Sequence, residues 1–164
     1  MKILITGNLG YVGPSVIRRL RTRYPMATLV GVDMAYFAHC LTDAAVIPES
    51  QLTLQCFADV RRLPDGLLDD VSAVVHLAAI SNDPMGNAHE AVTLDVNYRA
   101  SVELTRRAKS AGVSSFVFAS SCSVYGSADS GPRTESSELN PLTAYARSKV
   151  LTESAIAELA DKNF

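Results

Sequence analysis

The stretch Gly7-Asn8-Leu9-Gly10-Tyr11-Val12-Gly13 lies between an apolar run, Lys2 to Thr6, and a segment with helical spacing, Tyr11 to Tyr24. The run has the length and the β-branched content of a buried strand. A glycine-rich turn that closes a strand and opens a helix is typical of phosphate binding, because the helix offers unpaired backbone N–H groups to an anion. The stretch therefore predicts a strand, a phosphate-binding turn and a helix.

The glycines of this turn have separate predicted tasks. Gly7 permits the tight turn, Gly10 lets the backbone approach a pyrophosphate, and Gly13 lets the helix lie close to the strand. A glycine-rich turn with a purely structural role is the alternative, which the flanking strand and helix make the weaker one. The residues predicted to bind a dinucleotide here are Gly7, Gly10, Tyr11, Val12 and Gly13.

Apolar runs and helical segments alternate along the rest of the chain. This alternation indicates crossover units and a parallel sheet that is covered on both faces. We expect an α/β fold, a doubly wound parallel sheet of the Rossmann type with helices on both faces, formed by residues 1–164 as one domain. The expected strands are Lys2 to Thr6, Thr28 to Asp33, Leu52 to Phe57, Ala73 to Leu77 and Ser115 to Ala119. The expected helices are Tyr11 to Tyr24, Arg62 to Leu68, Ala88 to Ala111 and Leu142 to Ala160.

The composition argues against several classes of protein. The net charge is −2 and the basic residues are scattered, so we expect no nucleic-acid partner. The 3 cysteines have no CxxC or Cys/His spacing, which supports neither a disulfide framework nor a metal site. The first apolar run is too short for a signal sequence, and no run is long enough to cross a membrane. We therefore expect a cytoplasmic protein with no membrane partner.

Carboxylates follow the second and third predicted strands. Asp33 lies about twenty residues past the glycines, where a carboxylate accepts hydrogen bonds from both adenosine ribose hydroxyls and repels a 2′-phosphate. It therefore predicts NAD rather than NADP as the cofactor. Asp59 and Val60 are predicted to lie beside the adenine, although Asp59 could instead cap the helix that follows.

Tyr145 and Lys149 are four residues apart on a predicted helix, so they share one face. A phenol is a weak base at neutral pH, but a neighbouring ammonium and a nicotinium ring both favour the phenolate. Tyr145 is therefore the predicted general acid/base, and Lys149 is its partner and a ligand of the nicotinamide ribose. Ser121, after the fifth strand, is predicted to hydrogen-bond the substrate oxygen that is oxidised or reduced. An ordinary surface pair on a helix is the alternative for Tyr145 and Lys149.

Further blocks accompany these motifs, and together they cover essentially the whole chain. They are His76-Leu77-Ala78-Ala79, Val96-Asn97 and Ser120-Ser121-Cys122-Ser123-Val124-Tyr125-Gly126. With the glycine turn, the two carboxylates and the Tyr/Lys pair, they resemble the extended short-chain dehydrogenase/reductase family, in its nucleotide-sugar epimerase/dehydratase branch.

The resemblance implies roles for residues that spacing alone does not assign. Leu77, Ala78 and Ala79 would lie along the cofactor, and Ser81 would lie near the nicotinamide ribose or the sugar. Asn97 would steady the active-site backbone, the alternative being an ordinary polar contact inside a helix.

The residues after Ser121 distinguish the branches of this family. Its 4,6-dehydratases carry Asp-Glu there, the acid and base that remove water, and related decarboxylases keep the Glu. This chain has Cys122 and Ser123 instead, and neither can take over that role. The run looks more like sugar 4-epimerases, which need one base and a returning hydride. The residues then expected on a nucleotide-sugar substrate are Ser81, Ser121, Cys122, Ser123 and Tyr145.

Other functions remain open beside NAD-dependent epimerisation. One is a reductase or dehydrogenase of the same family that acts on a non-sugar carbonyl, and another is a nucleotide-sugar dehydratase. A non-catalytic dinucleotide sensor is the third, but it would have no need of Ser121, Tyr145 and Lys149 together.

The chain reaches Phe164 at the end of the helix that carries Tyr145. Members of the family continue with a sixth strand and a C-terminal substrate domain. We therefore expect this chain to be the cofactor-binding part of a longer enzyme or a truncated product. The far sheet edge and the last helix would then expose apolar surface, so we expect association as a homodimer.

Overall fold

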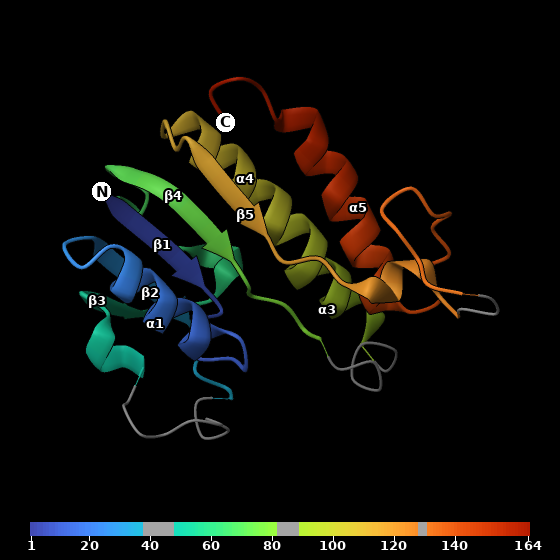
Figure 1. Ribbon diagram of the computed structural model, residues 1–164, viewed down its shortest axis with the longest axis horizontal. Coiled ribbons are helices and arrows are strands. Elements are labelled where there is room, and N and C mark those ends of the chain that lie inside the picture. The colour runs from blue at the N-terminus through green and yellow to red at the C-terminus, as the bar shows by residue number, and fades with distance from the viewer. Residues whose placement is uncertain (38–47, 82–88, 128–130) are drawn as a thin grey trace.

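Five parallel strands form one sheet in the order β3-β2-β1-β4-β5 (Figure 1). The computed structural model describes residues 1–37, 48–81, 89–127 and 131–164. The chain builds the sheet outward from β1 to one edge and then returns to the other side of β1. The point between β1 and β4 is therefore the switch point of the sheet, where this fold class binds ligands at the carboxyl ends of the strands. The strands are β1 (Lys2–Thr6), β2 (Thr28–Asp33), β3 (Leu54–Phe57), β4 (Val71–His76) and β5 (Ser115–Phe118).

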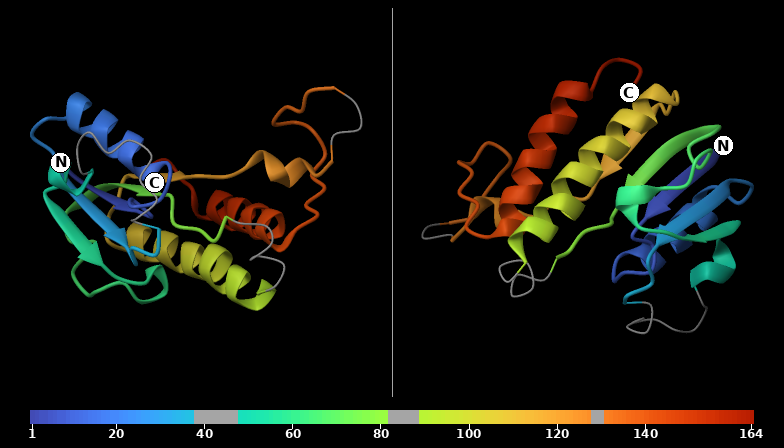
Figure 2. Two further views of the ribbon diagram at one scale, coloured as in Figure 1. Left: turned by 90° about the horizontal axis from the view of Figure 1, so that it is seen from below. Right: turned by 180° about the vertical axis from the view of Figure 1, so that it is seen from behind.

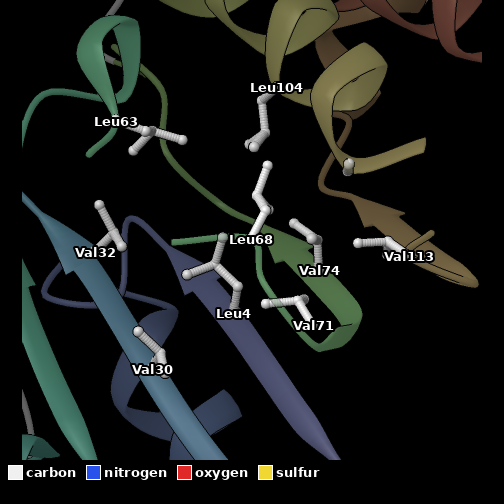
Figure 3. Close-up of a cluster of buried hydrophobic side chains, with 10 residues drawn as sticks. Leu4, Val30, Val32, Leu63, Leu68, Val71, Val74, Leu104 and Val113 are labelled. Carbon is white, nitrogen blue, oxygen red and sulfur yellow. The ribbon is translucent and has the colours of Figure 1, made fainter. Parts of the chain in front are cut away.

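Helices cover both faces of this sheet, as the two views of Figure 2 show. One face carries Ile3 and Ile5, which are buried on the side of α1 (Gly13–Arg23). The other face carries the larger cluster in Figure 3, to which α4 (Ala100–Ser110) contributes Leu104. Each fully buried side chain of this size contributes about 1.5–3 kcal/mol. The predicted doubly wound α/β fold is confirmed.

The third predicted helix is divided rather than continuous. It contains α3 (Glu90–Leu94), a π-helical turn (Asp95–Arg99) and then α4. Its predicted start, Ala88, lies outside the described residues. The N–H of Ala100 donates to the carbonyl oxygen of Asp95, which inserts one extra residue into the turn. The last helix, α5 (Ala144–Leu159), packs against α3 and α4.

The helix predicted over Arg62 to Leu68 is wrong. A single 3-10 turn, Val60–Arg62, is followed by turns through residues 65–70. Pro64 explains the difference, because the residue before a proline avoids helical backbone. Leu63 accordingly has φ −67° and ψ 140°.

The observed bounds of the strands agree with the predicted ones in part. The first two strands have their predicted bounds, whereas β3 begins at Leu54 rather than Leu52. Thr53 donates its N–H to the Leu29 carbonyl oxygen at 2.8 Å, but the N–H of Leu29 donates to Thr53 Oγ1 at 3.1 Å, so a side chain accepts one of the bonds at the start of this pairing. β4 begins earlier than predicted, at Val71. None of the helices in the described parts of the chain is long and apolar enough to span a membrane.

Candidate active site

The glycine turn follows β1 and leads into α1 as predicted. Gly7 has φ +72°, which favours glycine, and its N–H donates to the carbonyl oxygen of Val32 at 2.8 Å. A Cβ on Gly7 would lie 2.5 Å from the backbone nitrogen of Ala78. Gly10 closes the turn by donating to the Gly7 carbonyl oxygen at 3.1 Å. The missing side chains therefore let β1, β2 and the segment after β4 meet at one point.

The N-terminus of α1 is open to a ligand. Tyr11 and Val12 are 79% and 53% exposed. Val12, the residue before the first helical residue, has no side-chain acceptor and makes no capping bond to the first turn of the helix. A Cβ on Gly13 would overlap the carbonyl oxygen of Asn8, which explains why the helix can start so close to the turn. This geometry suits the binding of an anion at the helix end.

Leu77, Ala78 and Ala79 lie beside the glycine turn. The N–H of Leu77 donates to the carbonyl oxygen of Thr6 at 3.0 Å, which continues the pairing of β4 with β1. The structure thus brings these residues together with Gly7, across the switch point of the sheet. Ser81 follows them and is exposed, at the end of a described range.

Asp33 stands at the carboxyl end of β2 and touches the glycine turn. Its Oδ2 accepts the N–H of Leu9 at 3.1 Å, and its Oδ1 accepts the N–H of Ala35 at 2.7 Å. A carboxylate has about four acceptor positions, and the described residues of the chain use two of them. Asp33 therefore has a structural role that the sequence did not predict, which is to hold the glycine turn through the N–H of Leu9.

Asp59 adopts the capping role that was its alternative. Its Oδ1 accepts the N–H of Arg61 at 2.9 Å, at the start of the 3-10 turn, and its Oδ2 pairs with the Arg61 guanidinium at 2.6 Å. The hydrogen bonds from Arg61 hold the pKa of this carboxyl below its usual value. Val60 packs against the core cluster. Both residues are half-buried.

Tyr145 and Lys149 share the N-terminal half of α5, which Thr143 caps by accepting the N–H of Ala146 at 3.1 Å. The Lys149 Nζ lies 5.5 Å from the centroid of the Tyr145 ring. It donates to the carbonyl oxygen of Ala119 at 2.7 Å. Lys149 is only 3% exposed, and this burial lowers the pKa of its ammonium to about 8. The predicted pair therefore converges, with a positive charge held beside the phenol ring.

The seryl segment follows directly after the carbonyl group that Lys149 contacts. Ser121 caps a 3-10 turn, Cys122–Tyr125, and its Oγ accepts the N–H of Ser123 at 3.2 Å. Its hydroxyl also donates to the Ser123 Oγ at 3.1 Å. Cys122 carries an exposed free thiol. This turn contacts α5, so the structure brings the seryl segment and the Tyr145 helix together.

Asn97 lies buried in the π-helical turn and holds the backbone after β4. Its Oδ1 accepts the N–H of Ile80 at 2.7 Å, and its Nδ2 donates to the carbonyl oxygen of Ile80 at 2.9 Å. Its Nδ2 also donates to Ser148 Oγ at 3.2 Å, and Ser148 donates to the carbonyl oxygen of Tyr145. Asn97 thus connects the segment before Ser81 with α5, as expected of a residue that steadies this backbone.

A buried histidine joins the two halves of the site, and sequence reasoning gave it no role. The Nδ1 of His76 lies 2.5 Å from Thr6 Oγ1, and its Nε2 lies 2.7 Å from Ser101 Oγ. Because Ser101 donates its hydroxyl proton to the carbonyl oxygen of Asn97, Nε2 must be the donating nitrogen of His76. Burial lowers the pKa of His76 to about 3, so the ring is neutral. The available signal was that Thr6 and His76 are polar residues that end neighbouring apolar runs.

The fold and this arrangement define a doubly wound protein with a glycine-rich turn after its first strand and a Tyr145/Lys149 pair, in which the lysine is buried and the tyrosine is half-buried. The profile of the "NAD dependent epimerase/dehydratase family" matches residues 3–163, and the chain belongs to that family. The resemblance stated from the sequence motifs is therefore confirmed. Among the described residues, no group of three or more metal-binding side chains is present.

Individual relatives include epimerases and dehydratases. The chain is 31% identical to a UDP-glucose 4-epimerase of Lactobacillus helveticus, over 99% of this chain and 48% of that protein. A UDP-glucose-4-epimerase from Stenotrophomonas maltophila, solved with bound NAD and formylated UDP-arabinopyranose, is 30% identical with a TM-score of 0.82, over 98% of this chain and 48% of that one. The NDP-hexosamine 5,6-dehydratase TunA is 30% identical with a TM-score of 0.81, over 96% and 49%. The chain thus spans about half the length of the relatives it matches.

Proposed function

We propose that this chain is the NAD-binding and catalytic part of a nucleotide-sugar epimerase. The observation that carries the proposal is the Tyr145/Lys149 pair, with the Lys149 Nζ bonded to the carbonyl oxygen of Ala119 in the segment that leads to Ser121. The epimerases among the relatives support the substrate class. The positions after Ser121 favour epimerisation over dehydration, since Cys122 and Ser123 supply neither an acid nor a base for the loss of water.

The residues that would hold NAD fit that cofactor. The glycine turn and the open end of α1 suit the pyrophosphate, and Asp33 keeps acceptor positions for the adenosine ribose. Asp59 is proposed to lie beside the adenine, and Asn97 to fix the backbone along the nicotinamide side. NAD, when bound, would supply a hydride acceptor that returns the hydride in the same cycle.

The protein groups then have separate tasks in the proposed reaction. Tyr145 takes the proton of the sugar hydroxyl and later returns it. The Lys149 ammonium favours the phenolate form of that tyrosine. Ser121 hydrogen-bonds the same sugar oxygen, which requires its hydroxyl to turn away from Ser123.

The assembly and the compartment are further parts of this proposal. Exposed apolar side chains on two contacting helices, Val92 on α3 and Leu151 on α5, support a homodimer. The free thiols of Cys56 and Cys122 are consistent with the reducing cytoplasm.

Tyr145→Phe tests the proposed chemistry. With NAD present and the chain joined to the substrate domain expected of the longer enzyme, we expect epimerisation of a nucleotide sugar such as UDP-glucose without accumulation of NADH. The variant should lose at least about a hundredfold in rate, because general acid/base catalysis contributes that much. Its affinity for NAD, measured by calorimetry, should change less than about twofold, since the phenol hydroxyl is not needed to hold the pyrophosphate. Stoichiometric NADH would favour the reductase alternative, and an unchanged rate in Tyr145→Phe would contradict the proposal.

A further inference from the structure

Asn8, inside the glycine turn, carries a buried polar side chain that the proposed reaction does not use. The residue is fully buried. Its Nδ2 donates to Gln55 Oε1 at 2.6 Å, and its Oδ1 accepts from Gln55 Nε2 at 3.4 Å. The Gln55 Nε2 also donates to the carbonyl oxygen of Cys56 at 3.1 Å, which fixes the orientation of the Gln55 amide and with it that of Asn8. The two amides therefore form a reciprocal pair between the turn and β3.

The surrounding glycines make room for this pair. Gly31 lies beside Gln55 in the register of the sheet. A Cβ on Gly31 would lie 2.6 Å from the Nδ2 of Asn8 and 2.7 Å from its Cγ. A Cβ on Gly13 would overlap the Asn8 carbonyl oxygen from the other side. Asn8 is thus held between the first residue of α1 and the sheet, where it sets how close the helix end lies to the strands.

We infer that Gln55 is a positioning residue for the phosphate-binding turn, acting through Asn8. The inference rests on the proposed binding of NAD. The N–H groups of Gly7 and Leu9 donate to the end of β2 and so connect the turn to that strand. The amide pair of Asn8 and Gln55 connects the turn to β3. Backbone N–H groups lose hydrogen-bond strength when they are misdirected, so the orientation of the turn determines its affinity for a pyrophosphate.

Gln55→Leu is the variant that tests this inference. It keeps most of the side-chain volume and leaves the Asn8 amide buried without its partner. We expect the affinity for NAD and for ADP to fall about tenfold, because the turn no longer holds its N–H groups toward the pyrophosphate. Adenosine lacks the pyrophosphate, so its affinity should change less than about twofold by the same reasoning. Gln51→Leu is the matched control, because it makes the same substitution at a residue that does not pair with Asn8. It should change none of these affinities.

A second variant separates positioning from simple stabilisation. Asn8→Ala with Gln55→Leu removes both amides and leaves no buried amide without its partner, so thermal stability should exceed that of Gln55→Leu alone. The affinity for NAD should stay reduced, because the tie to β3 is still missing. Recovery of NAD affinity together with stability would overturn the inference, and so would an equal loss for NAD and adenosine in Gln55→Leu.

Hydrogen exchange tests the same inference without any ligand. In Gln55→Leu, the amides of Leu9 and Gly10 should exchange faster than in the unmodified chain, whereas those of α5 should not. Unchanged exchange at the turn would overturn the inference even if the unmodified chain failed to bind NAD. Failure to bind NAD would by itself contradict the proposed function.

Discussion

The buried ammonium of Lys149 lowers the stability of the folded chain, and it also places a positive charge beside Tyr145. It loses hydration and gains a hydrogen bond to the Ala119 carbonyl oxygen and contacts with the rings of Phe118 and Tyr145. Burial therefore lowers its pKa to about 8 from the usual 10.5. At neutral pH the side chain is still mostly protonated, which the proposed role requires.

Lys149→Met tests this balance through pH. Since the pKa of Lys149 is lower in the folded chain, the unfolded chain binds more protons between about pH 8 and 10.5, and the contribution of Lys149 to stability rises with pH there. The variant lacks this gain in stability with pH. We therefore expect its free energy of unfolding, relative to that of the unmodified chain, to fall by about 2 kcal/mol between pH 7 and pH 10. Urea unfolding at both pH values measures this. A difference that does not change with pH would contradict the assigned burial.

At the residue scale, the sequence predicted which side chains gather at the site better than which atoms they contact. The spacing of Tyr145 and Lys149 placed both on one helix face, because helical geometry is regular. Asp59 forms an ion pair with Arg61, and Asn8 forms a hydrogen bond with Gln55. The spacing of these residues in the sequence predicted neither side-chain contact. Such contacts depend on how β3 and the 3-10 turn are placed in three dimensions.

At the scale of elements, the packing of α1 on the turn depends on the absence of a side chain at Gly13. Gly13→Ala should destabilise the chain by at least about 3 kcal/mol, because the new methyl group would overlap the backbone of Asn8. Gly112→Ala is the matched control. Gly112 has φ +80° but open space around it, so the cost should be only about 1–2 kcal/mol of backbone strain. Thermal unfolding of both variants checks the prediction, which equal destabilisation would refute.

The π-helical turn depends on the chain of hydrogen bonds from Thr6 through His76 to Ser101. Ser101→Ala should cost about 1–3 kcal/mol, because it leaves the His76 Nε2–H buried without its acceptor. Ser114→Ala, which removes an exposed bond to the Ser72 carbonyl oxygen, should change stability by less than about 0.5 kcal/mol. Chemical denaturation of the two variants gives the comparison. If both cost the same, the buried histidine does not support this turn.

Periodicity predicted the strands and most helices, since continuous apolar runs leave few alternatives in a parallel sheet. It failed over Arg62 to Leu68, where the apolar pattern continues past Pro64 and the backbone does not. It also missed the π-helical turn, because one inserted residue barely alters an apolar pattern. The Asn97 carbonyl oxygen in this turn accepts a local bond from Ser101 and a tertiary bond from Thr152 on α5.

At the scale of the whole molecule, the proposed homodimer makes the outer surface of α5 a contact surface. Leu151→Glu should convert the dimer to a monomer, because it would bury a charge in an apolar interface. Leu54→Glu, at a similarly exposed position on the edge strand β3, should leave the assembly unchanged. Light scattering coupled to size-exclusion chromatography distinguishes the two results. A monomeric unmodified chain, or a dimer that survives Leu151→Glu, would contradict this mode of assembly.

The most direct test of the central claim is a calorimetric titration of the 164-residue chain with NAD and with NADP. The glycine turn, the open end of α1 and Asp33 together predict that NAD binds and that NADP binds at least about tenfold more weakly, because the carboxylate repels a 2′-phosphate. Equal binding of the two dinucleotides would contradict the role of Asp33. Binding of neither would contradict the proposed site as a whole.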